Sequence, residues 1–160
     1  MAEEATLVII KPDAIQRGLA GAVLSRLEAL RLEVIGAKVA RVSRQLAETH
    51  YAHLREKPFF AELLDYLQGK LHGTSSVLVL VLWGPEAIAC VRRCAGATNP
   101  EQAEPTSIRG ALGRITTSGI MENLLHASAD SAEAAREIAL WFTPEELLRP
   151  VPGVSAPPRR

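Results

Sequence analysis

Apolar residues follow a strand pattern in some segments and a helical spacing in others, and the alternation of these segments along the chain predicts an α+β fold. Continuous apolar and β-branched runs at residues 6–11 and 77–83 are typical of strands buried on both faces, and the second run should be central. Residues 33–42 alternate and predict another strand, and a short one is expected at residues 123–127. Apolar residues at helical spacing predict helices at residues 23–31, 43–54, 58–67, 86–95 and 131–142.

The order of these elements indicates a topology. Two β-α-β units with four strands predict a ferredoxin-like βαββαβ fold, an antiparallel four-stranded sheet with helices packed on one face. Residues 96–117 contain Pro and Gly with little periodicity, and irregular segments of this length are commonly functional. We expect one domain over residues 1–148, followed by a Pro-rich C-terminal tail over residues 149–160.

Charge and composition exclude several classes of partner. The chain has 18 Lys and Arg against 18 Asp and Glu, so no bulk field attracts nucleic acid or an anionic membrane. Its longest apolar runs are far below the roughly 20 residues of a membrane span. A secretory signal pattern does not precede the first strand. We therefore expect a cytoplasmic protein with neither a nucleic-acid nor a membrane partner.

Several familiar chemical motifs are missing from the sequence. Cys90 and Cys94 lie four apart on a predicted helix and are interpreted as reduced small hydrophobes rather than a redox pair. The spacing of Cys and His does not match a zinc site. A Gly-rich Walker loop, a dinucleotide fingerprint and a Ser-centred hydrolase elbow are also absent. A bound triphosphate would thus not be held in a P-loop.

His126, at the end of a short apolar stretch, is the main candidate for chemistry. With a reference pKa near 6.5, much of an imidazole is neutral and nucleophilic at physiological pH. Attack on phosphorus needs one ring nitrogen free and the other held, and Glu137 could hold it directly or through Ser128. A histidine near a strand is also compatible with a satisfied core residue, but the neighbouring residues favour a phosphate acceptor.

Dispersed cations support the same interpretation. Phosphoryl transfer depends mainly on positioning and on neutralising the phosphate oxygens. Lys11 ends a predicted strand, Arg92 lies on a predicted helix and Arg109 in the long irregular segment, so the three are expected to converge at one edge of the sheet. Arg93 and Arg114 are expected to be solvated surface charges.

Aromatic residues leave two interpretations open. Phe59 and Leu63 lie one turn apart on a predicted helix, with Tyr51 nearby in sequence. Such residues pack in cores, but an aromatic ring with an aliphatic neighbour also offers a surface on which any base can stack.

Several separated motifs occur in the order found in one known family, from about residue 6 to 148. They read VIIKPDAIQRGL at 8–19, HY at 50–51, KPFF at 57–60, GATNP at 96–100, SIRG at 107–110, NLLHAS at 123–128 and AAREIALWF at 134–142. On these motifs the chain resembles the nucleoside diphosphate kinases. The resemblance implies a ping-pong kinase that moves the terminal phosphate of a nucleoside triphosphate to a nucleoside diphosphate.

The resemblance also implies roles for individual residues. His126 would carry the phosphate, Glu137 would orient it, and Ser128 would be a second hydrogen-bonding neighbour, with Lys11 also in the catalytic group. Contacts to phosphates or ribose are implied for Lys11, Tyr51, Arg92, Thr98, Arg109 and Asn123. Phe59 would stack on the base with Leu63 beside it. Mg²⁺ bridging the phosphates and a homo-oligomer, a hexamer or tetramer, are implied as well.

Two other functions remain as alternatives. A non-catalytic nucleotide-binding or protein-interaction module of the same fold is disfavoured, because a decayed site would be expected to lose at least one functional residue. A phosphohistidine relay between proteins would have no need of Phe59 or of the basic residues.

The sequence departs from the family pattern at three places. Residues 69–76 and 113–122 are longer than usual, and the second segment precedes the predicted catalytic strand, where it could reshape the nucleotide entrance or a subunit contact. The family's His-Gly-Ser-Asp stands here as His126 to Ala129, with Asp130 one place later. We expect lower activity from this change, with the mechanism retained.

Overall fold

A computed structural model describes residues 1–155; residues 156–160, at the end of the predicted tail, lie outside the described residues. The main sheet has the strand order β2-β3-β1-β6, and all neighbouring strands are antiparallel. Its strands are β1 (Glu3–Ile10), β2 (Glu33–Arg41), β3 (Ser76–Pro85) and β6 (Leu125–Ala127). The predicted four-stranded, ferredoxin-like α+β sheet is confirmed, and β3 is an interior strand as its apolar run predicted.

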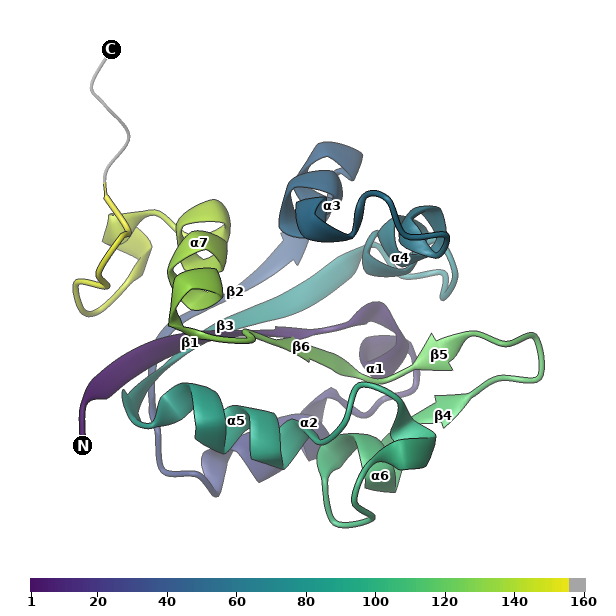
Figure 1. The fold of residues 1–160 in the computed structure, drawn as a ribbon, viewed down its shortest axis with the longest axis horizontal. Coiled ribbons are helices and arrows are strands. Elements are labelled where there is room, and N and C mark those ends of the chain that lie inside the picture. Colours follow the sequence, from purple (N-terminus) through teal and green to yellow (C-terminus); the bar gives the residue numbers. More distant parts are fainter. Residues whose placement is uncertain (156–160) are drawn as a thin grey trace.

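Helices cover both faces of this sheet, so the predicted packing on one face is wrong. Figure 1 shows α7, α3 and α4 on one side of the sheet and α5, α2 and α6 on the other. The helices are α1 (Pro12–Gln16), α2 (Ala20–Glu28), α3 (Arg44–His50), α4 (Phe60–Leu67), α5 (Ala87–Ala95), α6 (Ile108–Leu112) and α7 (Ser131–Trp141).

The burial of β1 explains why both faces need cover. Residues 5–10 are all buried, and a strand points successive side chains to opposite faces. Leu7 and Ile9 enter a core with α7 and α4, whereas Val8 and Ile10 enter a second core with α2 and α5. A strand that is apolar at every position therefore requires two layers of helices.

The long irregular segment contains more structure than its sequence predicted. It includes the 3₁₀ turn Pro100–Gln102 and the helix α6, whose N-cap Ser107 accepts a hydrogen bond from the backbone N–H of Gly110. The hairpin β4 (Arg114–Ile115) and β5 (Met121–Glu122) follows it. A five-residue helix is too short to show a helical period, so placing Arg109 in a loop was wrong.

Several helix ends also differ from the prediction. The helix predicted over residues 43–54 is α3 followed by the separate 3₁₀ turn Ala52–Leu54, and α4 begins after Phe59 rather than at Pro58. Helix α7 begins at Ser131 as predicted, and Asp130 is its N-cap: the carboxylate accepts a hydrogen bond from the backbone N–H of Glu133 at 2.8 Å.

Residues beyond Leu148 continue to pack on the chain's own core. The backbone N–H of Leu148 donates to the carbonyl of Ile35 at 2.8 Å, Val151 is buried, and Val154 packs against the same cluster. The domain boundary at residue 148 stays a prediction. Among the described residues, none of the helices has the length and apolarity that crossing a membrane requires.

Candidate active site

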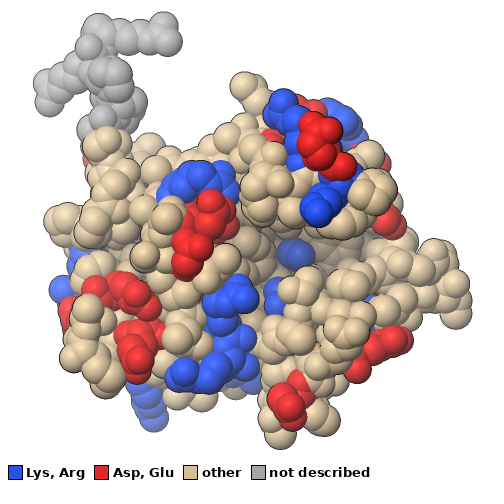
Figure 2. Space-filling model, viewed as in Figure 1, with Lys and Arg blue, Asp and Glu red and all other residues tan. Residues whose placement is uncertain are grey.

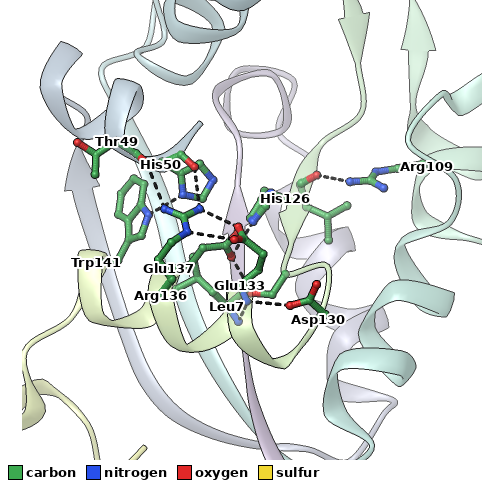
Figure 3. A network of polar contacts seen from close by, with 12 residues as sticks. Leu7, Thr49, His50, Arg109, His126, Asp130, Glu133, Arg136, Glu137 and Trp141 are labelled. Atoms are coloured by element: carbon green, nitrogen blue, oxygen red, sulfur yellow. Dashed lines mark hydrogen bonds and ion pairs between the residues drawn. The ribbon is translucent and has the colours of Figure 1, made fainter. Parts of the chain in front are cut away.

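The register of the edge strand β6 places His126 beside a buried carboxylate. His126 lies opposite Ile9 of β1, so its side chain is on the sheet face that α7 and α3 cover. Its Nε2 lies 2.9 Å from Oε2 of Glu137 on α7 (Figure 3). The His126 side chain keeps 17% of its surface exposed, whereas Glu137 keeps 2%. The imidazole is therefore anchored at one nitrogen, and a small part of the side chain is open to solvent.

Ser128 completes the support of this pair. Its hydroxyl donates to Oε2 of Glu137 at 2.7 Å and accepts from the backbone N–H of Leu7 at 3.1 Å. Burial raises the pKa of Glu137, and the hydrogen bond from Ser128 opposes that shift. With Nε2 engaged by Glu137, the atom of the ring left for chemistry is Nδ1.

The surroundings of His126 keep the ring neutral. Burial lowers its pKa well below the usual value for histidine, and the charges of Lys11 and Arg109 lower it further. A neutral imidazole that donates through Nε2–H has its lone pair on Nδ1. The site thus presents an unprotonated nucleophile at physiological pH, next to cations that suit an anionic substrate.

Lys11 follows β1 and is almost fully buried. Its Nζ donates to Oδ1 of Asn123 at 3.0 Å and lies 5.1 Å from the centre of the Tyr66 ring. Burial, helped by the charge of Arg109, lowers the pKa of Lys11 to about 7. The side-chain N–H₂ of Asn123 donates to the carbonyl of Thr98 at 3.0 Å, so the amide joins the lysine to the loop after α5.

Arg109 organises the same region from α6. Its Nε, Nη1 and Nη2 donate to the carbonyls of Asn123, Gly96 and Leu125 at 3.2, 2.9 and 2.7 Å. These bonds use only part of the five N–H groups of a guanidinium. Burial and the neighbouring charge of Arg92 lower the pKa of Arg109 to about 10. Figure 2 shows Lys and Arg atoms at the floor of the hollow in the middle of this face.

The structure therefore brings the three predicted cations into one region. Lys11 and Arg109 are buried and influence His126 directly, and Arg92 is exposed on α5 close to Arg109. Arg93 is exposed, as predicted. Arg114 is exposed as predicted, and its Nε also donates to the buried carboxylate of Glu122 at 2.6 Å.

The predicted nucleoside-contacting residues differ in exposure. Tyr51 is buried, its ring centre lies 6.4 Å from that of His126, and burial raises its pKa. Thr98 is exposed, with its carbonyl held by Asn123. Phe59 is 47% exposed, which argues against simple core packing, whereas Leu63 is half-buried against the core. An exposed ring with an aliphatic neighbour is the arrangement that base stacking needs.

The donor set around His126 bears on the implied magnesium ion. Ring nitrogens of His50 and His126 and a carboxylate oxygen of Glu137 lie within 4.8 Å of one another, but Mg²⁺ prefers oxygen ligands and keeps several waters. Ala129 offers no carboxylate, and Asp130 is used as the cap of α7. These residues fit an ion held mainly by substrate phosphates, and they do not form a protein cage for Mg²⁺.

Sequence reasoning missed the groups that hold the nucleophile's segment in place. Leu124 has a φ of 69°, a left-handed conformation that is strained for a branched side chain. Its backbone N–H donates to Oδ2 of Asp13 at 3.1 Å, and its carbonyl accepts from the backbone N–H of Lys11 at 2.8 Å. Asp13 occurs in the motif at residues 8–19 without a signal of this contact, and a positive φ at a leucine leaves no signal in sequence.

The site combines an imidazole that a carboxylate holds at one nitrogen with buried cations, on an antiparallel α+β sheet. These features define a phosphotransferase site. The family model "Nucleoside diphosphate kinase" matches residues 4–147. A nucleoside diphosphate kinase of Pyrococcus horikoshii is 48% identical over 144 residues, covering 90% of this chain and 88% of the relative. One of Thermus thermophilus is 46% identical over 145 residues, covering 91% and 99%.

Solved structures agree with this similarity. A nucleoside diphosphate kinase of Halobacterium salinarum in complex with CDP has a TM-score of 0.83 and 37% identity, covering 92% of this chain and 93% of that one. A transition-state mimic of the Borrelia burgdorferi enzyme with vanadate and ADP has a TM-score of 0.81 and 34% identity, covering 92% of both chains. The chain belongs to the nucleoside diphosphate kinase family and is an enzyme of the phosphotransferase class.

Proposed function

We propose that this enzyme transfers the terminal phosphate of a nucleoside triphosphate to a nucleoside diphosphate in two half-reactions, with Nδ1 of His126 as the carrier. The observation that supports this most strongly is the 2.9 Å contact between His126 Nε2 and Glu137, which leaves Nδ1 as the open nitrogen of a neutral ring. The alternative of a non-catalytic module of the same fold does not account for a nucleophile prepared in this way.

Each half-reaction is a balanced displacement at phosphorus. In the first, the Nδ1 lone pair forms the N–P bond while the bond to the leaving oxygen breaks, and the nucleoside diphosphate departs with those electrons. In the second, a terminal oxygen of another nucleoside diphosphate attacks the phosphohistidine and Nδ1 leaves with its lone pair restored. Glu137 stabilises the positive charge that the ring acquires, because it accepts the Nε2–H hydrogen bond throughout.

The cations neutralise the transferring group. The Asn123 side chain holds Lys11, and main-chain carbonyls hold the guanidinium of Arg109, whose remaining N–H groups are free. Both cations therefore need little reorganisation when a phosphate enters. Arg92 is exposed and supplies a further positive charge at the entrance. A magnesium ion, when bound by the substrate phosphates, would add charge neutralisation.

The nucleoside is bound by contacts that do not read the base. Phe59 stacks on the base with Leu63 beside it, which makes the enzyme tolerant of different bases because every base has a π-face. Tyr51, Thr98 and Asn123 contact the phosphates or the ribose. This assignment rests on the matched motif positions and on the exposure of Phe59.

The setting of the enzyme belongs to the same proposal. We expect it to work in the cytoplasm as a homo-oligomer, a hexamer or tetramer, with nucleoside tri- and diphosphates as its partners and with neither nucleic acid nor membrane. The predicted division into a kinase domain at residues 1–148 and a tail at 149–160 is retained as part of the proposal.

A labelling experiment tests the carrier directly. Incubation with ATP labelled at the terminal phosphate should label the enzyme in an acid-labile form, and addition of GDP or CDP should remove the label. His126→Gln should take up no label. Label that persists with every diphosphate would favour a relay between proteins, absence of label would favour the binding module, and transfer by the variant would refute His126 as carrier.

A further inference from the structure

A second histidine touches the nucleophile and has no role in the mechanism above. His50 ends α3 and is 1% exposed. Its ring centre lies 4.6 Å from that of His126 with an interplanar angle of 81°, an edge-to-face contact. Figure 3 shows His50 between Trp141 on one side and His126 on the other.

Trp141 determines where the proton of His50 resides. Its indole Nε1–H donates to Nδ1 of His50 at 3.1 Å. An indole can only donate, so Nδ1 must be the acceptor and a neutral His50 has its proton on Nε2. Burial lowers the pKa of His50 well below the usual value, and the proximity of His126 lowers it further. His50 is thus a neutral donor with a fixed tautomer.

That donor has no acceptor among the described residues. Nε2 of His50 is fully buried without a hydrogen-bond partner, an arrangement that destabilises the folded protein. A phenyl ring at this position would pack without that cost. Ring nitrogens of His50 and His126 and an oxygen of Glu137 nevertheless lie within 4.8 Å of one another. His50 therefore places a polar ring beside the reacting pair at the expense of stability.

The position of His50 relative to this pair is set by α7. Arg136 donates to the backbone carbonyls of Thr49 and His50 at 3.2 and 3.0 Å and pairs with Glu133 on its own helix. Trp141, which holds the His50 ring, lies on the same helix as Glu137. One rigid element therefore supports both neighbours of the His126 ring.

We propose that His50 is a positioning residue for the phosphotransfer step: with its proton fixed on Nε2 by Trp141, its ring holds His126 and Glu137 in the arrangement that leaves Nδ1 of His126 free. This inference rests on the proposed function of His126. His50 does not touch the substrate in this account, so it should affect the rate of phosphoryl transfer and not the binding of nucleotide.

Three variants test the proposal by single-turnover labelling with ATP. His50→Phe keeps an edge-on ring but removes both nitrogens, and the double variant His50→Phe/Trp141→Phe also removes the indole N–H that the first variant leaves unpaired. Trp83→Phe is the matched control, because its indole N–H donates to Glu3 outside the site at 3.0 Å. We expect about tenfold slower labelling in both His50 variants, the order seen when a partner orienting a functional histidine is lost, and no change in the control.

Two further readouts separate positioning from a merely structural role. The KM for ATP should stay close to that of the parent in both His50 variants, and a thermal unfolding curve should show that the double variant is folded at the assay temperature. Nitrogen NMR of the ring should show the Nε2–H tautomer of His126 in the parent and a mixture of tautomers in His50→Phe. Labelling at the parental rate in both His50 variants, an unchanged His126 tautomer, or a rate loss matched by a rise in KM or by unfolding would overturn the proposal.

A failure of the proposed function has a different signature. The parent enzyme would then take up no label at all, while the tautomer measurement still reports on His50 without any turnover.

Discussion

Within the described residues, two histidine–glutamate pairs have nearly the same contact distance and different surroundings. His126 lies 2.9 Å from Glu137 at the active site, and His72 lies 3.0 Å from Glu122 where the loop after α4 meets the β4–β5 hairpin. In the first pair the histidine side chain is 17% exposed, whereas both side chains of the second pair are 5% exposed.

The pKa values of the two carboxylates are shifted in opposite directions, although burial acts on both in the same way. Burial raises the pKa of Glu137, and the hydrogen bond from Ser128 only partly offsets it. Burial would also raise the pKa of Glu122, but hydrogen bonds from Arg114 and His72 lower it below the usual value. Glu122 is further paired with Arg17 at 3.6 Å. Arginine partners thus make the second pair a cross-link between segments.

Access to the second ring nitrogen separates a nucleophile from a structural histidine. Nδ1 of His72 is buried without a hydrogen-bond partner in the described chain, so no substrate can reach it. The His126 side chain keeps 17% of its surface exposed and lies close enough to Lys11 and Arg109 for their charges to lower its pKa. A histidine–glutamate pair therefore supports chemistry at His126 and Glu137, and another joins two segments at His72 and Glu122.

The largest expected difference is in activity. His126→Gln should lower phosphate transfer from ATP to GDP by about 10³-fold or more, because it removes the nucleophile. His72→Gln should keep the transfer rate within about twofold, since amide and imidazole can both donate to Glu122. A coupled assay for triphosphate formation measures both, and equal losses in the two variants would break the comparison.

Loss of the His72–Glu122 pair should lower the stability of the protein more than its activity. Glu122→Ala leaves the buried N–H of His72 without an acceptor, so we expect a loss of about 1–3 kcal/mol in the free energy of unfolding. Glu48→Ala, which removes an exposed i,i+4 pair with Arg44, is the control and should cost less than about 0.5 kcal/mol. Urea denaturation measures the free energy of unfolding of both variants. A loss in Glu122→Ala no greater than that in Glu48→Ala would contradict the role of Glu122 as a cross-link between segments.

The pH dependence of substrate capture should follow Lys11 rather than His126. With a pKa of about 7, Lys11 loses its charge in the free enzyme as the pH rises through neutrality. We expect kcat/KM for ATP to fall above pH 7, by at most about tenfold per pH unit. Lys11→Arg keeps its charge, so its kcat/KM should fall less steeply above pH 7 even if its overall rate is lower. A profile that rises through pH 7 would contradict the assignment.

The smallest expected effect is on stability in mild acid. Because the pKa of folded His126 is lowered, the unfolded chain binds more protons below its own pKa of about 6.5, and stability falls as the pH falls. Between pH 7 and 6 this histidine should account for a loss of about 0.7 kcal/mol. His126→Gln should lose that much less over the same interval, measured by urea denaturation. An identical pH dependence in parent and variant would contradict the lowered pKa.

Much of the fold was predictable because its strands are strongly patterned. The apolar runs that became β1 and β3 could only be interior strands, and the order of elements then left few topologies. The five-residue α6 and the two-residue β4 and β5 were not predictable, since such short elements have no period and depend on contacts such as that of Arg114 with Glu122.

The main residues of the candidate site could be predicted from sequence, but the contacts between them could not. The sequence singles out His126, Glu137 and Lys11, whereas His50 occurs in a family motif without an implied role. The edge-to-face contact of His50 with His126 joins residues 76 positions apart, through a helix packed on the sheet. No local pattern encodes such a contact.

By itself, the sequence determined the alternation of strands and helices, the family and the chemical groups available for phosphate transfer, because these depend on local periodicity and residue type. Only the tertiary structure decided that helices cover both faces of the sheet and which of two similar histidine–glutamate pairs opens to substrate. Burial and access are properties of segments brought together from across the chain, so they appear only once the chain has folded.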